Sequence, residues 1–287
     1  MQVYLIKRLM LFIPTMLLVF TLVFVILRVV PGDPAVAMLS GGAQTEKAFT
    51  QEDVDRLKAK LGTDRPLVVQ YGDWIWGLTR LDFGTSFFYD QPIWDDIKDR
   101  FPITFELTVL ALLMAGIVAV PLGVLSAIKQ DSLPDYIGRI ITIGGIAIPN
   151  FWIGILMVFF LANVFDWLPP LGYTDIWKDP WTNLQQLVFP ALALAITHMA
   201  FVGRVTRSAA LEVIREDYIR TARSKGLSEK IVIWRHVLKN ALLPVVTVAG
   251  YEFGRLMGGT VLIETIFNVP GMGQLLIGGI NHRDFPM

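Results

Sequence analysis

Three long apolar runs without a single charged residue constrain this chain more than any other feature. They cover residues 9–27, 107–128 and 140–165. The hydrocarbon core of a bilayer is about 30 Å thick, a distance that a helix of roughly 20 apolar residues spans. Only 17% of the 287 residues are charged, whereas about 25% is usual in soluble domains. The sequence therefore predicts an all-α, polytopic membrane protein.

Two weaker runs, residues 187–202 and 241–263, bring the expected number of spans to five. The first contains His198, and the second contains Glu252 and Arg255. Ionisable groups are costly to bury inside spans, so these three are candidate functional residues. Glu252 and Arg255 lie three positions apart and can pair on one helix face. We interpret them as a self-satisfied pair or as part of a polar pathway, and His198 as an interior hydrogen-bonded histidine or a proton relay.

Basic residues beside the spans predict the orientation, because Lys and Arg concentrate in cytoplasmic loops. Lys7 and Arg8 precede the first span, and Lys129 and Arg139 flank the loop after the second. Between the fourth and fifth spans lie nine more: Arg204, Arg207, Arg215, Arg220, Arg223, Lys225, Lys230, Arg235 and Lys239. All fall on one side if the N-terminus is cytoplasmic. The expected parts are a first span (1–30), an extracytoplasmic lobe (31–102) and a core transmembrane domain (103–287) with a cytoplasmic region at 203–240.

The extracytoplasmic lobe shows two helix signals. Thr50 is a helix-capping residue with Asp53 three positions later, and Gly62 suits the end of that helix. Pro66 is expected to open a second helix that carries Tyr71, Trp74 and Trp76. Aromatic side chains of this kind favour the membrane–water boundary. We therefore interpret the lobe as an interfacial lid on the spans or as a docking surface for an external partner.

The cytoplasmic region 203–240 is longer than a loop needs to be if it only carries topology signals. Residues 204–215 and 216–225 both have helical patterns, and in the second the acidic residues come first and the basic ones last. That order suits the helix dipole. Gly226 is expected to end this helix, and Ser228 to cap the next one. A short helix held between two longer ones is suited to binding another protein.

The sequence lacks the patterns of the common catalytic and metal sites. It contains no cysteine, no phosphate-binding loop, no His-Glu-x-x-His and no Gly-x-Ser-x-Gly, so thiol chemistry, P-loop ATP hydrolysis and intramembrane hydrolysis lack support. The net charge of zero argues against a nucleic-acid partner. We expect no catalytic residue, metal site or cofactor in this chain. Energy for transport would then come from a gradient or from a partner.

Several short strings occur in the order found in one transporter family. They are Lys-Arg at 7–8, Pro-Gly-Asp-Pro at 31–34, Leu-Gly at 61–62, Asp-Phe-Gly-Thr-Ser at 82–86, Glu-Asp-Tyr-Ile-Arg-Thr-Ala-Arg-Ser-Lys-Gly at 216–226, Arg-His at 235–236, Lys-Asn-Ala-Leu-Leu-Pro at 239–244, Glu-Thr-Ile-Phe at 264–267, Pro-Gly-Met-Gly at 270–273 and Arg-Asp-Phe-Pro at 283–286. With these strings the chain resembles permease subunits of binding-protein-dependent ABC importers, in the dipeptide/oligopeptide (peptide/nickel) branch.

The resemblance implies the type I ABC importer transmembrane fold, with a sixth span after residue 286, so we expect this 287-residue chain to be shortened. It also implies that one segment couples the permease to an ATP-hydrolysing subunit, through Glu216, Asp217, Tyr218, Arg220, Thr221, Ala222, Arg223, Lys225 and Gly226. Ala222 and Gly226 match the small residue and the glycine of the family pattern, and a small residue would let the helix seat closely in a groove of the partner. Arg220 stands where the general pattern has glutamate.

The implied function is that of a permease forming half of a translocation pathway for di- and oligopeptides. Its implied partners are a homologous second permease, two ATP-binding subunits at the cytoplasmic face, an extracytoplasmic solute-binding protein and membrane lipid. ATP and magnesium would bind only to partner subunits, and the implied location is the bacterial or archaeal cytoplasmic (inner) membrane. One alternative is the same machine importing nickel, glutathione or another small solute. A gradient-driven transporter or channel that uses His198, Glu252 and Arg255, and a scaffold without transport activity, also remain open.

Overall fold

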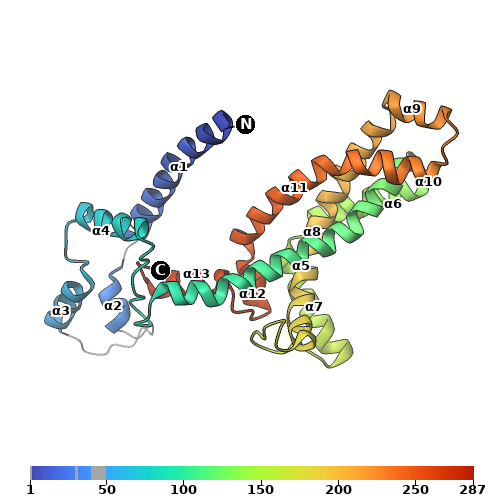
Figure 1. Ribbon diagram of the computed structural model, residues 1–287. Helices are drawn as coiled ribbons and strands as arrows, with labels where there is room; N and C mark the ends of the chain where they lie inside the picture. The colour runs from blue at the N-terminus through green and yellow to red at the C-terminus, as the bar shows by residue number, and fades with distance from the viewer. Residues whose placement is uncertain (1, 30–31, 40–49) are drawn as a thin grey trace. The chain divides into compact units, whose positions relative to one another are not determined.

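The computed structural model describes residues 2–29, 32–39 and 50–287, and these residues are predominantly helical (Figure 1). Over the described ranges, the only extended pairing is an isolated bridge between Thr85 and Pro92. The chain forms two compact units, one made of residues 1–98 together with 276–287 and the other of residues 99–275. The C-terminal segment thus belongs to the same unit as the N-terminal helix. The expected division at residues 30 and 102 stays a prediction.

Within the described residues, four helical stretches are long and apolar enough to cross a membrane. They are α1 (Gln2–Val29), α5 (Ile93–Ile128), α8 (Pro180–Ile214) and the stretch Glu229–Gly259, which ends with α11 (Leu238–Gly259). The first, second and fourth predicted spans lie inside α1, α5 and α8. The fifth was predicted to continue to residue 263, but it ends at Gly259, because a break at Thr260 separates α11 from α12 (Val261–Ile266).

The third predicted span, residues 140–165, is not one straight helix. It consists of α6 (Leu133–Ala147) and α7 (Asn150–Phe165), which meet at an angle of 96°. Ile148 between them is extended, with φ −96° and ψ 124°. Proline has no N–H, and its ring excludes the helical conformation of the residue before it, so Pro149 ends α6 and caps α7. The apolar run therefore forms two helices joined at a sharp bend, a geometry that fits a broken span or a re-entrant loop.

α1 is the most apolar of the long helices and the least buried. Phe24 is its one buried residue among those described. Its exposed side chains are aliphatic or aromatic over most of its length, including Leu9, Met10, Leu11, Phe12 and Ile13. A helix that is apolar all round is suited to a lipid environment.

α4 (Leu67–Thr79) packs on α1 through aromatic side chains. Tyr71 and Trp74 contact Phe24, with ring centroids 5.1 and 5.9 Å apart, and the Tyr71 hydroxyl lies 2.6 Å from that of Thr21. Trp76 points away and is 60% exposed. Pro66 precedes this helix as predicted. Two of the three predicted aromatic residues therefore serve the packing of α4 on a span, which supports the interpretation of a lid.

The predicted cap of α3 (Gln51–Leu61) is confirmed. The Thr50 hydroxyl accepts the Asp53 backbone N–H, and the Asp53 carboxylate accepts the Thr50 N–H in return. The Thr50 hydroxyl also donates to the Asp53 carboxylate, and this bond together with that from the Thr50 N–H lowers the pKa of Asp53. Gly62 ends the helix in the left-handed conformation, with φ 68°. The short α2 (Pro34–Leu39) lies beside α3, where Lys58 pairs with Asp33.

α8 is the central helix of the second unit. It packs against α6, α7 and α11, and 61% of its most apolar segment is buried. Its inward positions are mostly small or aliphatic, and they form a core with α5 at Leu107 and Ala111. Small side chains let neighbouring helices approach closely, as they do in membrane bundles. This core joins α5 and α8 to α11 and α12 through Leu256 and Ile263.

The second unit has two distinct ends. α9 (Asp217–Ser224), α10 (Glu229–Ile231) and a π-helical stretch, η1 (Val232–Val237), lie at one end with the start of α6, and α7 lies at the other (Figure 1). The helix predicted at residues 204–215 is the last part of α8, and the helix predicted at 216–225 is α9. α12 and α13 (Met272–His282) complete the chain's helices. The segment predicted to meet a partner is therefore folded onto the end of the bundle.

Candidate functional site

α9 is seated on the bundle by two inward side chains. Ile219 is fully buried and Ala222 is 7% exposed. They belong to a cluster that joins α5, α8, η1 and α11, with Ala127, Ala209, Ala210, Val232, Val237 and Ala241. This apolar contact fixes α9 to the helices that form the bundle, so a displacement of α9 would be transmitted to them.

The opposite face of α9 is charged and exposed. The Arg220 side chain is 74% exposed, and its one ion pair among the residues that the structure describes is with Asp217, one turn earlier. Arg223 donates from Nε and Nη2 to the two carboxylate oxygens of Glu229, at 2.7 and 3.3 Å, which ties α9 to α10. The Tyr218 hydroxyl accepts a hydrogen bond from Asn240 of α11 at 3.0 Å. The predicted coupling residues other than Ala222 are thus exposed, also including Glu216, Thr221, Lys225 and Gly226.

The predicted role of Ala222 needs correction. Its small side chain was expected to fit a groove of a partner, but it faces the core of its own chain. It therefore lets α9 approach its own bundle closely. Gly226 has φ 77°, and a Cβ there would meet nothing within 4 Å. This glycine is required by the left-handed backbone that ends α9, and not by crowding.

A polar pocket of about 540 Å³ lies between the end of α8 and the start of α9. Its lining combines arginines and carboxylates, namely Arg207, Ser208, Leu211, Glu212, Arg215, Glu216 and Asp217. The pocket adjoins the exposed face of α9. It gives this end of the bundle a polar surface of both signs.

The three intramembrane candidates, His198, Glu252 and Arg255, meet between α8 and α11. Arg255 donates from Nε to Oε2 of Glu252 at 3.0 Å, and its Nη2 lies 2.8 Å from the same oxygen. This confirms the predicted pair. Nδ1 of His198 lies 2.7 Å from Oε2 as well, close enough for an ion pair if the ring is protonated, although the ring N–H is not aligned for a hydrogen bond. The His198 and Glu252 side chains are 1% and 4% exposed, whereas that of Arg255 is 55% exposed.

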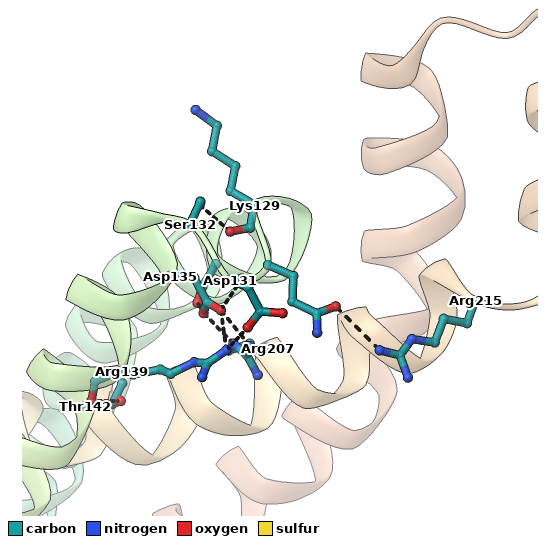
Figure 2. Close-up of polar contacts among 10 residues, drawn as sticks. Lys129, Asp131, Ser132, Asp135, Arg139, Thr142, Arg207 and Arg215 are labelled. Atoms are coloured by element: carbon teal, nitrogen blue, oxygen red, sulfur yellow. Dashed lines mark hydrogen bonds and ion pairs between the residues drawn. The ribbon is translucent and has the colours of Figure 1, made fainter.

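A second cluster, centred on Asp135, was not singled out from the sequence. Figure 2 shows Arg139 and Arg207 converging on the Asp135 carboxylate. Arg207 binds it in a bidentate manner at 2.7 and 2.8 Å, and Nη2 of Arg139 lies 2.5 Å away. The Ser126 hydroxyl and the backbone N–H of Asp131 also donate to it. Asp135 is fully buried.

This Asp135 cluster joins the α5–α6 loop to α8 near α9. Bidentate, charge-assisted hydrogen bonds of this kind are strong and directional. The spacing of Asp135 and Arg139 at a helix start is a local signal that the sequence offered. The partner Arg207 is 72 residues away, and no spacing rule connects it to Asp135.

The strings at 264–267 and 270–273 form a single structure around a buried carboxylate. Glu264 is fully buried and accepts hydrogen bonds from the hydroxyls of Thr104 and Thr260, both at 2.7 Å, and from the N–H of Gln274 at 3.1 Å. A Cβ on Gly271 would lie 2.5 Å from the Glu264 carboxylate. The loop between α12 and α13 therefore needs glycine there, because it wraps directly over Glu264.

The strings at 82–86 and 283–286 also meet, within the first unit. Asp284 is 4% exposed and accepts hydrogen bonds from the Ser86 hydroxyl and from the N–H of Phe87 at 2.9 Å. His282 stacks on Phe88 with ring centroids 3.7 Å apart. These two strings thus act as structural anchors that hold the C-terminal segment on the N-terminal part of the chain.

The loop between α7 and α8 is anchored to the bundle by Tyr173. Its hydroxyl donates to Glu106 of α5 at 2.6 Å. Burial raises the pKa of Tyr173, and the hydrogen bond to Glu106 raises it further. Gln186 and Asn183 of α8 bind the backbone of Thr174 in the same loop. This end of the unit is therefore ordered by polar contacts, whereas α9 is seated by apolar ones.

Two further cavities are mainly apolar. One of about 800 Å³ lies between α7 and α8, and one of about 960 Å³ lies between α5, α6 and α8, next to Arg139 and Arg207. Among the residues that the structure describes, no group of three or more His, Asp or Glu side chains is arranged to hold a metal ion.

Comparison with known families identifies the kind of protein. Residues 119–287 match the family described as binding-protein-dependent transport system inner membrane component. Residues 1–108 match the family that describes the N-terminal part of binding-protein-dependent transport system membrane components. The two matches together cover nearly the whole chain.

Individual relatives are similar over the full length of the chain. A putative peptide transport system permease protein of Brucella suis biovar 1 is 40% identical over 287 residues, which cover 100% of this chain and 90% of that protein. A dipeptide transport system permease protein of Alkalihalophilus pseudofirmus is 37% identical, with 100% and 90% covered. A glutathione transport system permease protein of Pectobacterium atrosepticum is 37% identical, with 99% and 88% covered. A crystal structure of an amino acid ABC transporter with histidines covers 67% of this chain and 82% of its own, at 17% identity and a TM-score of 0.49.

Proposed function

Because this chain belongs to the inner-membrane components of binding-protein-dependent transport systems, we propose that it is a permease subunit of an ATP-driven peptide importer. It forms half of the translocation pathway, and a homologous second permease forms the other half. The chain itself changes no covalent bond. ATP and magnesium bind to two partner subunits, and a solute-binding protein delivers the cargo from outside.

The observation that carries this proposal is the seating of α9. Its inner face is locked into the ends of α5, α8 and α11 through Ile219 and Ala222, and its outer face presents exposed charges such as Arg220. A partner that binds the outer face of α9 can therefore move the ends of these helices together. This is what coupling of ATP hydrolysis to alternating access requires.

The end of the second unit that carries α9 faces the cytoplasm in this proposal. Lys129, Arg139 and the nine basic residues of region 203–240 belong to this end. The loop at the other end contains Asp166, Asp175 and Asp179 with one lysine, Lys178. This asymmetry supports the orientation through the excess of Lys and Arg in cytoplasmic loops. The N-terminus is cytoplasmic by the same argument, and the membrane is the inner membrane.

Peptides are the proposed cargo, because relatives similar over the full length of this chain carry peptide or dipeptide transport in their names. Glutathione, named for a 37% identical relative, is itself a tripeptide. Both kinds of cargo have free carboxylates and peptide bonds. A cargo of this class favours a pathway with hydrogen-bonding and cationic groups over one built for a bare metal ion.

The test removes the charge of Arg220 with a matched control. We expect Arg220→Ala to lower co-purification of the ATP-binding subunits at least about fivefold, because truncating one partner of a charge pair in an interface costs more than about 1 kcal/mol. Arg56→Ala is the control, since its side chain is 75% exposed, against 74% for Arg220, and also pairs with a carboxylate one turn earlier. It should leave co-purification unchanged. Equal recovery of the subunits with both variants would contradict docking at α9.

The buried contact between His198 and Glu252 favours a second candidate, a gradient-driven transporter. The same preparation separates the two. Reconstituted protein that takes up peptide without ATP or partner subunits, in response to a proton gradient, would support this second candidate. Uptake that requires the partner subunits, and ATP on the side of the membrane where they bind, supports the importer.

A further inference from the structure

Arg255 is placed unusually for a charged residue of a membrane-spanning helix. It lies four residues before the end of α11, and its side chain is 55% exposed. Arginines near helix ends commonly extend outward to the membrane surface. The guanidinium of Arg255 instead reaches back one turn, to Glu252. The charge is therefore held inside the span by a buried carboxylate.

The contacts leave part of the guanidinium unused. Nε and Nη2 of Arg255 both contact Oε2 of Glu252. Among the described residues, Nη1 has no hydrogen bond or ion pair. His198 fills the other side of Oε2, at 2.7 Å, so Glu252 cannot rotate freely. A carboxylate approaching the Nη1/Nη2 edge would find two donors in the planar arrangement that bidentate recognition needs.

The exposed face of α11 around Arg255 is unsuited to lipid. From Thr247 onward, the exposed residues of α11 are small, polar or amphipathic: Thr247, Gly250, Tyr251, Gly254, Arg255, Gly258 and Gly259. No exposed aliphatic side chain occurs in this part of the described helix, in contrast to the aliphatic surface of α1. An arginine facing lipid costs up to about 3 kcal/mol at the centre of a span. The face is therefore covered by water, cargo or protein.

We propose that Arg255 faces the translocation pathway and binds the terminal carboxylate of the peptide cargo. His198 and Glu252 are positioning residues that hold the guanidinium with its Nη1/Nη2 edge toward the pathway. This proposal rests on the proposed function for the identity of the cargo. The water-accessible, anion-binding character of the Arg255 face is independent of that identity.

The chain contains no cysteine, so a single cysteine can report on this face in the assembled transporter. A Cβ on Gly254 would meet nothing within 4 Å, so Gly254→Cys fits the structure. We expect Cys at 254 to react faster with the anionic reagent sulfonatoethyl methanethiosulfonate than with the cationic trimethylammonium analogue. Adding Arg255→Gln should reduce that preference by up to about a hundredfold, since removing a full charge about 6 Å away changes the energies of the two reagents by about 1.4 kcal/mol each, in opposite directions, at an intermediate dielectric. Labelling of this chain is read by mass spectrometry.

A matched control distinguishes a position that water reaches in the membrane from one that is exposed in the single chain but covered by lipid in the membrane. Met10 on α1 is 68% exposed, and Met10→Cys should stay unreactive because lipid covers it. Reaction at 254 with a charge preference that depends on Arg255 supports the proposal. No reaction at 254 would overturn it and would indicate that a partner helix packs on the small residues of α11. Reaction without charge preference would overturn it as well.

Uptake tests the carboxylate directly. A defined tripeptide mixture with free C-termini is compared with the same mixture amidated. Arg255→Gln should lower uptake of the free acids at least about tenfold, and Arg255→Lys less, with a smaller effect of Arg255→Gln on the amides. Equal losses for both mixtures would overturn carboxylate binding and leave a structural role. Absence of any peptide uptake by the unmodified protein would overturn the proposed function, while the labelling preference would still decide whether Arg255 binds anions from water.

Discussion

Two buried carboxylates of the second unit are both held by arginine, yet one cluster is closed and the other is open. Both oxygens of Asp135 are occupied, by Arg207, Arg139, the Ser126 hydroxyl and a backbone N–H. The contacts of Glu252 all fall on one oxygen, and the arginine that makes two of them is half exposed. The first cluster has two cations converging on one anion, and the second leaves an arginine edge unused.

This difference indicates which cluster has a structural role and which one can bind a ligand. A closed network fixes the α5–α6 loop to α8 and leaves neither oxygen of the Asp135 carboxylate free, although Nε of Arg139 has no hydrogen-bond partner among the described residues. An open network in a span keeps a charge at a position that lipid does not tolerate, which implies another function for that charge. Changes to the Asp135 cluster should therefore lower stability and transport together. Changes to the Arg255 cluster should lower transport by more than the loss of stability explains.

The largest expected effect follows from removing the charge of Asp135. Asp135→Asn leaves Arg207 and Arg139 facing a neutral amide, and breaking a buried pair typically costs about 3 kcal/mol. We expect that loss in the free energy of unfolding, measured by SDS titration of the purified protein with tryptophan fluorescence, and a parallel loss of uptake. Asp131→Asn is the control, because Asp131 is 62% exposed and asparagine accepts its left-handed backbone, with φ 58°. Equal effects of both variants would show that the Asp135 cluster is not closed.

The next effect concerns the pair Glu252 and Arg255. Glu252→Gln alone leaves the arginine without its anion and should cost about 2 kcal/mol of stability, less than at Asp135 because Arg255 is half exposed. The double variant Glu252→Gln with Arg255→Gln should be more stable than Glu252→Gln alone, because no unpaired charge remains. Arg255→Gln alone leaves the buried Glu252 carboxylate with only His198 beside it among the described residues, so it should cost a similar amount of stability, but it should lower uptake far more than Glu252→Gln does. If stability and uptake fall in the same proportion for all three variants, Arg255 has a structural role like that of the Asp135 cluster.

Sequence reasoning found the features that depend on neighbours along the chain. The capping residues Thr50 and Asp53, the left-handed Gly226 and the pair Glu252–Arg255 all follow from spacings of three or four residues or from the backbone freedom of glycine. The joining of His198 to that pair was not predicted, because His198 lies on another helix. Local rules hold for α9 as well, since its boundaries agree with the prediction within one residue.

What sequence reasoning missed depends on tertiary contacts or on the geometry of a single residue. Asp135 and Arg207 are 72 residues apart, and Ser86 and Asp284 are 198 apart, so no periodicity connects them. The inward direction of Ala222 follows from where the bundle lies, which an amphipathic pattern does not give by itself. Pro149 was a local signal for an interruption of the run 140–165, but a proline in an apolar run does not give the size of the bend, which is 96°.

The smallest effect tests how completely the Asp135 cluster is satisfied. Ser126→Ala removes one hydrogen bond from a carboxylate that retains both Arg207 contacts, so stability should fall by only about 1 kcal/mol. Ser132→Ala is the control, because within the described part of the chain its exposed hydroxyl binds only the carbonyl of Lys129, and it should change the unfolding midpoint less. A loss for Ser126→Ala as large as that for Asp135→Asn would mean that the serine positions the carboxylate for both arginines. The cluster would then depend on one hydroxyl, and the closed state would be far easier to open than its number of contacts suggests.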